Sequence, residues 1–151
     1  MVTARVERQL SGYTLDQLFS IAANFETYPR FLPLCRAMRV LERQGPEADG
    51  HEVLKVDNVF GLSGVRIRFL SEATFAPPSA IDIVSTDGPF ERLDIAWRFA
   101  ETRANECSVS FEISPRFRSG VMAEIATLFS NTLKEKTIDA FAAEAKKRFG
   151  G

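Results

Sequence analysis

The chain has 151 residues and a formal net charge of -1, with 45% hydrophobic and 26% charged residues. A chain of this length most simply forms one domain, here residues 1–151, and folding buries roughly 70% of its unfolded surface. The near-neutral charge disfavours broad nucleic-acid binding, so no DNA partner is expected. The 13 Phe beside 2 Tyr and 1 Trp indicate either a thick aromatic core or a core built around an apolar cavity.

The N-terminal residues MVTARVERQL are polar and alternating, without the apolar segment of a signal peptide. No apolar run reaches the roughly 20 residues of a membrane span. Cys35 and Cys107 form no C-x-x-C motif, which favours two reduced thiols over a metal site or a disulfide. These features predict a cytoplasmic protein.

In chain order, the first predicted elements are a strand and two short helices. Residues 2–9 alternate apolar and charged side chains, as a strand does. Thr14 and Gln17 stand in capping-box register, and apolar residues repeat at helical spacing to about Asn24. A short helical turn is expected to follow as far as Tyr28.

Residues 27–35, TYPRFLPLC, are too apolar for a solvated loop. Pro29 and Pro33 remove two backbone donors and disfavour helical geometry in the residues before them. We interpret this segment as a non-helical lid whose apolar side chains face a cavity. The candidate ligand contacts in and beside it are Phe25, Tyr28, Phe31, Leu32, Pro33 and Leu34.

Alternating apolar and polar side chains predict further strands at residues 36–43, 52–59, 65–69, 81–83, 92–99 and 106–113. One charged face and short turn-like linkers are typical of an antiparallel meander that is wet on one side. Glu72 falls on the outer face with Arg66 and Arg68, which predicts a cross-strand ion pair. The candidate cavity residues on the inner face are Val65, Ile67, Phe69, Trp97, Phe99 and Phe111.

Residues 120–149 change to helical spacing and predict one helix of about 29 residues, about 43 Å long. Ser119 is the candidate cap at its start and Gly150 the stop. One helix covers only part of such a sheet, so either aromatic rings fill the remaining space or a cavity remains. The candidate ligand contacts at this end of the chain are Phe117, Met122, Ile125 and Phe129.

The sequence contains no arrangement of residues that is typical of a catalytic site. The only histidine, His51, lies in a turn-like stretch, so Cys35 and Ser63 gain no general base. The FGLSG segment, residues 60–64, joins two strands and does not open a helix, unlike a phosphate loop. Its Phe60 and Leu62 either pack on a neighbouring loop or face residues 28–35 across the mouth of the cavity. No metal and no catalytic cofactor are expected.

Four stretches, YPRFLPLC, DGPFERLDIAWRF, CSVSFEISPRFRS and AFAAEAKKRFG, resemble in order the coenzyme Q-binding START-like proteins of the polyketide cyclase/dehydrase and lipid-transport superfamily. The resemblance implies an α+β helix-grip fold, in which a curved antiparallel sheet of about seven strands surrounds a long C-terminal helix. It implies a non-enzymatic protein that binds ubiquinone or a related isoprenoid lipid and supports respiratory electron transport. For such a ligand, transient contact with a membrane surface, at the periphery of the inner membrane, is a further expectation. Leu34 and Glu72 depart from the family, which often has an aromatic and a basic residue there.

Two other functions stay open. Bacterial ribosome-association toxins are similar to the same family, and Arg30, Arg36, Arg39, Arg116 and Arg118 are candidates for a basic patch that binds the large ribosomal subunit. An aromatase or cyclase would need polar groups inside the cavity, and the alternation of the strands places few there.

Overall fold

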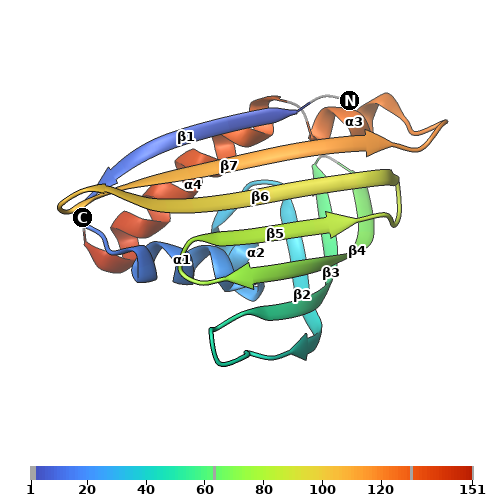
Figure 1. Ribbon diagram of the computed structural model, residues 1–151. Helices are drawn as coiled ribbons and strands as arrows, with labels where there is room; N and C mark the ends of the chain where they lie inside the picture. The colour runs from blue at the N-terminus through green and yellow to red at the C-terminus, as the bar shows by residue number, and fades with distance from the viewer. Residues whose placement is uncertain (1–2, 63, 130, 151) are drawn as a thin grey trace.

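The computed structural model describes residues 3–62, 64–129 and 131–150. Within these ranges the strands form one antiparallel sheet in the order β1-β7-β6-β5-β4-β3-β2 (Figure 1). The strands are β1 (Ala4–Ser11), β2 (Cys35–Gln44), β3 (Glu52–Leu62), β4 (Val65–Ala76), β5 (Ala80–Ser85), β6 (Phe90–Arg103) and β7 (Glu106–Phe117). The sheet is a meander from β2 to β7, and β1 pairs with β7 at the far edge. The predicted α+β architecture with a curved seven-stranded sheet is confirmed.

Helices cover one face of this sheet. The helical elements are α1 (Leu15–Ala23), a 3₁₀ turn (Phe25–Thr27), α2 (Tyr28–Phe31), α3 (Ala123–Leu128) and α4 (Asn131–Phe149). Phe19 of α1 and Phe141 of α4 both pack against the ring of Phe99 on β6, so these two helices share the inner face. Helix α4 runs behind β1, β7 and β6 in the view of Figure 1. No helix in the described ranges combines the length and the apolar character needed to cross a membrane.

The start of α1 is fixed by the predicted capping box. The Thr14 hydroxyl accepts a hydrogen bond from the Gln17 backbone N–H at 3.1 Å. The Gln17 side chain in turn accepts one from the Thr14 backbone N–H at 3.0 Å. Two backbone donors at the helix N-terminus are thereby satisfied. This cap directs the apolar side of α1, including Leu18 and Ile21, into the core.

The C-terminal segment forms two helices, so the prediction of one helix over residues 120–149 is wrong. Helix α3 ends at Leu128, and Phe129 leaves helical geometry with φ -111° and ψ 28°. Residues 127–132, TLFSNT, are rich in types with low helix propensity. The Phe129 side chain gains burial by packing against Phe90 of β6 at 5.1 Å between ring centroids. Tertiary packing thus outweighs the continuity of the helix.

The two ends of this segment also differ in how well they were predicted. Ser119 does not cap the helix: the residue before α3 is Met122, and it makes no side-chain capping hydrogen bond. The stop at Gly150 is as predicted, because Gly150 takes a positive φ of 69° and its N–H donates to the Lys146 carbonyl at 2.8 Å.

The lid segment is partly helical, which corrects the prediction that its prolines exclude a helix. Tyr28–Phe31 form α2, and Pro29 lies in the first turn, where a missing backbone donor costs nothing. The chain becomes extended at Leu32, and Leu34 takes a positive φ of 69°. Such a conformation costs a non-glycine residue about 1–2 kcal/mol, so the lid reaches β2 through a strained residue.

The outer face of the sheet carries ion pairs, but not the predicted one at Glu72. Lys55 lies directly opposite Glu72 in the β3–β4 register, yet its ammonium group pairs with Glu42 at 3.3 Å. Within the described residues Glu72 has no ion-pair partner within 4.0 Å. The Arg68 guanidinium instead forms an ion pair with the Asp57 carboxylate, and 2.9 Å separates its Nε from the Asp57 Oδ1. The prediction is wrong because Lys55 pairs with Glu42, its register partner on β2, and Arg68 pairs with Asp57.

Candidate functional site

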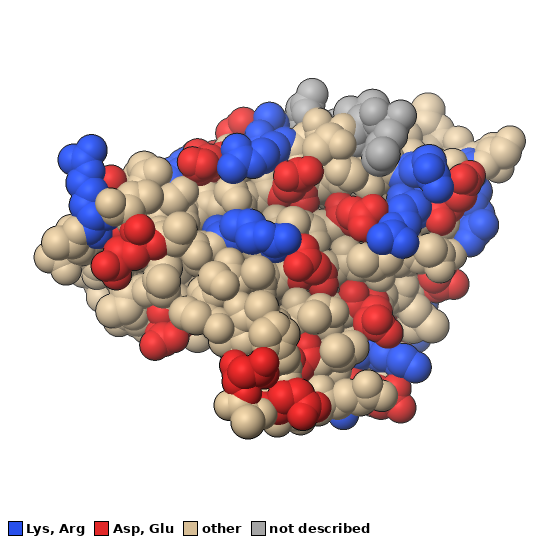
Figure 2. Space-filling model, in the orientation of Figure 1, with Lys and Arg blue, Asp and Glu red and all other residues tan. Residues whose placement is uncertain are grey.

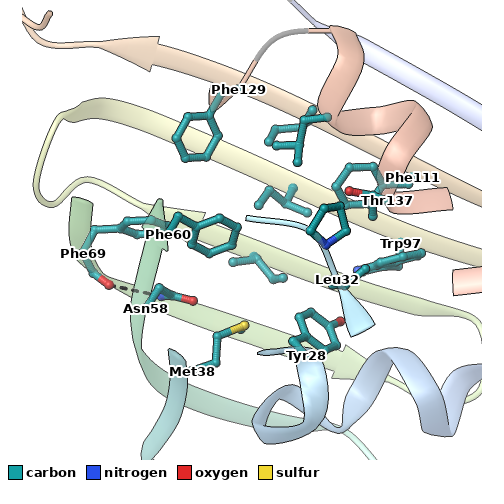
Figure 3. A pocket seen from close by; sticks show the side chains of 15 residues that line it. Tyr28, Leu32, Met38, Asn58, Phe60, Phe69, Trp97, Phe111, Phe129 and Thr137 are labelled. Atoms are coloured by element: carbon teal, nitrogen blue, oxygen red, sulfur yellow. Dashed lines mark hydrogen bonds between the residues drawn. The ribbon is translucent and has the colours of Figure 1, made fainter. Parts of the chain in front are cut away.

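An apolar pocket lies between the inner face of the sheet, the lid and the C-terminal helices (Figure 3). Its volume is about 50 Å³. Its lining comes from α2 and the residues after it, from strands β2 to β7, and from α4 and the residues before it. The lining residues are Tyr28, Leu32, Pro33, Met38, Asn58, Phe60, Phe69, Ile83, Ile95, Trp97, Phe111, Ile113, Phe129, Leu133 and Thr137.

Aromatic rings form the two ends of the pocket. At one end Phe60 packs against both Phe69 and Phe129, with ring centroids 5.8 and 6.0 Å apart. At the other end Trp97 packs against Phe111 at 4.8 Å. Aromatic pairs contribute a stabilising free energy in addition to that of the apolar area that they bury. Both ends of the pocket are therefore well packed. The apolar content of the pocket therefore follows directly from the alternation of β3, β4, β6 and β7.

The lid is fastened to β3 through backbone groups. The Gly61 N–H donates to the Leu34 carbonyl at 2.8 Å. The Arg36 guanidinium donates from Nε to the Gly61 carbonyl at 3.1 Å. Cys35 is the first residue of β2 and pairs with Phe60. The lid and the Phe60 end of the pocket are consequently one connected unit.

Tyr28 anchors the other end of the lid. Its hydroxyl donates a hydrogen bond to the Ala22 carbonyl at the end of α1. Burial raises the pKa of Tyr28 far above its usual value, the nearby Cys35 thiol raises it further, and the Trp97 indole N–H opposes the change. The geometry between Tyr28 and Trp97 falls short of a hydrogen bond, because the Trp97 Nε1 is buried without a partner among the described residues. Tyr28 is therefore a neutral phenol with a structural role.

Two polar side chains, Asn58 and Thr137, enter this apolar lining from opposite sides. Asn58 lies on β3 and Thr137 on α4, and both are buried. Figure 3 shows their oxygen atoms directed toward the space between them. These two oxygens are the polar atoms that the two side chains direct toward the pocket, whereas the Trp97 Nε1 is fully enclosed and has no partner among the described residues.

The pocket offers little acid–base chemistry. Among the described residues that line it there is no Asp, Glu, His, Lys or Arg. Tyr28 is its single hydroxyl of the phenol type, and its raised pKa keeps it protonated near neutral pH. Among the described residues, no group of three or more His, Cys, Asp or Glu side chains is arranged to hold a metal ion. The arrangement is suited to enclosing an apolar molecule.

Eight of the candidate residues from the sequence line the pocket. They are Tyr28, Leu32, Pro33, Phe60, Phe69, Trp97, Phe111 and Phe129. The other described candidates lie outside the lining, namely Phe25, Phe31, Leu34, Val65, Ile67, Phe99, Phe117, Met122 and Ile125. The side chain of the remaining candidate, Leu62, lies outside the described part of the structure.

The candidates outside the lining have other surroundings. Phe25 packs against Phe75 in the core at 5.4 Å, and Phe99 is covered by Phe19 and Phe141. Met122 is exposed, with 56% of its surface accessible. These residues are predicted as ligand contacts, but their position along the sheet or helix directs them away from the pocket lining.

Sequence reasoning missed seven lining residues. They are Met38, Asn58, Ile83, Ile95, Ile113, Leu133 and Thr137. The alternation of the strands contained the signal for the three isoleucines, which share a face with Phe69 and Trp97. Asn58 continues the inward series of Leu54 and Val56, but a polar residue in such a series gives no sign of its hydrogen-bond partners.

Both cysteines are buried free thiols. Burial raises the pKa of Cys35 to about 12. Burial is also the larger cause of the raised pKa of Cys107, whose thiol donates to the Tyr13 carbonyl at 3.4 Å. Neither thiol has the exposed, electropositive surroundings of a reactive cysteine.

The candidate basic residues mostly have protein partners. Arg36, Arg39, Arg116 and Arg118 interact respectively with the Gly61 carbonyl, the Asp57 carboxylate, the Glu91 carboxylate and the Gly88 carbonyl. On the face seen in Figure 2, Lys and Arg are interspersed with Asp and Glu. This face presents no field of a single sign.

A curved antiparallel sheet that wraps a C-terminal helix and encloses an apolar pocket defines the helix-grip, START-like class of proteins. The model of the family described as polyketide cyclase / dehydrase and lipid transport matches residues 11–142, and the chain belongs to this family. A solved structure of an 18 kDa protein from Caulobacter crescentus is 27% identical and has a TM-score of 0.78, with 100% of both chains covered.

Two kinds of curated relatives are similar to the chain. The coenzyme Q-binding protein COQ10, mitochondrial, of Drosophila melanogaster is 26% identical over 148 residues, covering 95% of this chain. The chain spans only 59% of the length of that protein. The ribosome association toxin RatA of Vibrio cholerae serotype O1 is 27% identical over 141 residues, covering 93% of this chain and 94% of the toxin.

Proposed function

We propose that the chain is a non-enzymatic binding protein for ubiquinone or a related polyprenyl lipid and that it supports respiratory electron transport. The observation that carries the proposal is the pocket lining, which is apolar or aromatic except for Asn58 and Thr137. Each methylene group that a ligand buries there contributes about 0.8 kcal/mol, so a few isoprene units give tight binding. The similarity to a coenzyme Q-binding protein supports the same ligand class.

Binding requires the pocket to open. Its volume of about 50 Å³ is far below the roughly 300–1,000 Å³ of a typical ligand pocket. Leu32 and Pro33 of the lid and Phe129 between α3 and α4 are the lining residues outside regular elements. We expect these segments to move outward when a lipid binds, and contact with a membrane surface is the natural place for that movement.

The composition of the lining supports binding over catalysis. A cyclase would need a group that donates and accepts protons near neutral pH, and an ideal catalytic pKa lies close to the working pH. The raised pKa of Tyr28 moves it away from that range.

The test is to extract the purified protein with organic solvent and to identify bound lipid by mass spectrometry. Because Trp97 is the only tryptophan and lines the pocket, its fluorescence reports the binding of added short-chain ubiquinone. A polyprenyl lipid in the extract and saturable quenching are expected. A clean extract together with no response to the added quinone contradicts the proposal.

Association with the large ribosomal subunit is the second candidate function. The observation in its favour is that the similarity to the ribosome association toxin extends over 94% of that protein. Cosedimentation with large subunits that weakens steeply as salt increases is the expected result, because contacts with phosphates release counterions. Absence of cosedimentation at low salt excludes this function and leaves the lipid proposal intact.

A further inference from the structure

Asn58 is held in one orientation by three acceptors on one side of its amide group. Its Nδ2 lies 3.1 Å from the Phe69 carbonyl oxygen, 3.3 Å from the Val56 carbonyl oxygen and 2.9 Å from the Ser71 hydroxyl. Rotating the amide by half a turn would place its oxygen against two carbonyl oxygens and leave the Ser71 hydroxyl as its one available donor. The hydrogen-bond network therefore assigns the nitrogen to the β3–β4 side and the oxygen to the pocket side.

The oxygen of Asn58 is consequently a fixed acceptor inside an apolar pocket. Only 3% of the Asn58 surface is accessible, and Figure 3 shows its Oδ1 directed into the pocket. Among the described residues no donor reaches this oxygen. This oxygen is not among the fully enclosed polar atoms that lack a partner, so it borders the pocket space. A ligand hydroxyl placed there gains a hydrogen bond that a ligand with only acceptors cannot form.

The indole of Trp97 does not distinguish a ligand with a hydroxyl from a ligand with only acceptors. Its Nε1 is a buried donor with no partner among the described residues, and Trp97 lies across the pocket from Asn58 in Figure 3. An indole N–H binds the oxygen of a carbonyl, a hydroxyl or an ether alike. Trp97 therefore cannot be the source of a preference between the two kinds of ring, while Asn58 favours a ring that carries a hydroxyl hydrogen.

We propose that the pocket selects ligands whose ring carries a free hydroxyl, so that the reduced quinol form of a polyprenyl quinone binds more tightly than the oxidised quinone. The inference rests on the proposed lipid-binding function and adds the chemical state of the head group. A quinol hydroxyl donates to the Asn58 Oδ1, whereas a quinone carbonyl at the same place sets two acceptors against each other. We expect a preference of roughly tenfold or more.

The test measures the dissociation constants of two ligand pairs with the full chain by isothermal titration calorimetry without oxygen. The first pair is decylubiquinol and decylubiquinone. The second is a long-chain 4-alkylphenol and its methyl ether, which differ in the hydroxyl hydrogen without any redox chemistry. Both are measured on the unmodified protein, on Asn58→Leu and on the control Ser110→Ala, which removes a buried hydroxyl outside the pocket lining.

Tighter binding of the quinol and of the phenol by the unmodified protein is expected, with the preference lost in Asn58→Leu and kept in Ser110→Ala. Equal affinities within both pairs overturn the inference and leave the lipid proposal standing. A preference that survives Asn58→Leu also overturns it, because Asn58 would not be its source. If none of the four ligands binds, the proposed function itself fails. The comparison within the unmodified protein remains decisive even if Asn58→Leu does not fold.

Discussion

The guanidinium carbon of Arg148, near the end of α4, lies 5.8 Å from the centre of the Phe31 ring in the lid. The same guanidinium donates to the Thr27 hydroxyl at 3.3 Å. Phe31 also packs edge-on against Tyr28, with 5.8 Å between the ring centroids. The Arg148 side chain thus connects the last turn of α4 to the lid through the Phe31 ring and the Thr27 hydroxyl. Phe31 itself does not line the pocket.

Arg148→Ala is expected to let the lid open more often. A cation–π contact at a partly exposed site contributes about 0.5–1 kcal/mol, so its loss should speed ligand release by about two- to fivefold. Stopped-flow measurement of Trp97 fluorescence during ligand release checks this rate. Lys147→Ala, which removes a neighbouring charge, is the control and should leave the rate unchanged. Equal rates for both variants would mean that Arg148 does not restrain the lid.

Leu133→Phe is expected to fill the pocket and block the ligand. Leu133 lines the space of about 50 Å³, so added carbon atoms enter a void there and the free energy of unfolding should change by less than about 1.5 kcal/mol. Leu54→Phe is the matched control, because Leu54 is fully buried and lies outside the lining. There the same change should cost about 1–3 kcal/mol.

Urea unfolding and ligand titration of the two variants separate these effects. The expected pattern is lost binding with retained stability in Leu133→Phe and the reverse in Leu54→Phe. Retained binding in Leu133→Phe would place the ligand elsewhere on the molecule.

The sheet and its inner face were predictable because alternation is a local property of the chain. Phe69, Trp97 and Phe111 fall on one face by counting residues, and the structure places all three in the pocket lining. Which inward residues meet the pocket was not predictable in this way. Phe99 has the same parity as Trp97, but Phe19 and Phe141 cover it, and both come from helices distant in the sequence.

The wrong predictions for the C-terminal helix and for the lid also arise because local sequence patterns do not show long-range packing. The interruption after Leu128 depends on the packing of Phe129 against Phe60 and Phe90, which local spacing does not reveal. Pro29 was read as a helix breaker, yet its place in the first turn of α2 makes it compatible with a helix. Local sequence patterns thus predict which face of the strands is apolar. Long-range packing determines which of these residues line the pocket.

The stability of the protein is expected to fall above pH 9. Burial raises the pKa of the Cys35 thiol from 9.0 to about 12 in the folded state. The unfolded thiol therefore loses its proton first, and the contribution of Cys35 to stability is complete below pH 9 and is lost as the pH rises toward 12. The loss amounts to about 1.4 kcal/mol at pH 10.

Urea unfolding at pH 8 and pH 10 measures this decrease. Cys35→Ala should show a smaller decrease between the two pH values, while the pKa of Tyr28, also raised by burial, still contributes part of it at higher pH. An identical pH dependence in Cys35→Ala and the unmodified protein would contradict the role of the thiol.

Gly61→Ala is expected to loosen the lid from β3. A Cβ atom on residue 61 would lie 2.5 Å from the Val65 carbonyl oxygen and 2.8 Å from the Arg66 Cγ, so the backbone must shift. That shift strains the hydrogen bond from residue 61 to the Leu34 carbonyl. We expect a loss of about 1–3 kcal/mol in stability, as for other overpacked sites.

Hydrogen exchange of the amides in residues 28–35 measures the effect on the lid. Gly64→Ala in the same hairpin is the control, because a Cβ atom there meets nothing within 4 Å although its positive φ of 84° still strains an alanine. Faster exchange in the lid of Gly61→Ala but not of Gly64→Ala is expected, since only Gly61 contacts the lid backbone. Unchanged exchange in both variants would show that the hydrogen bond to Leu34 does not control the opening of the pocket.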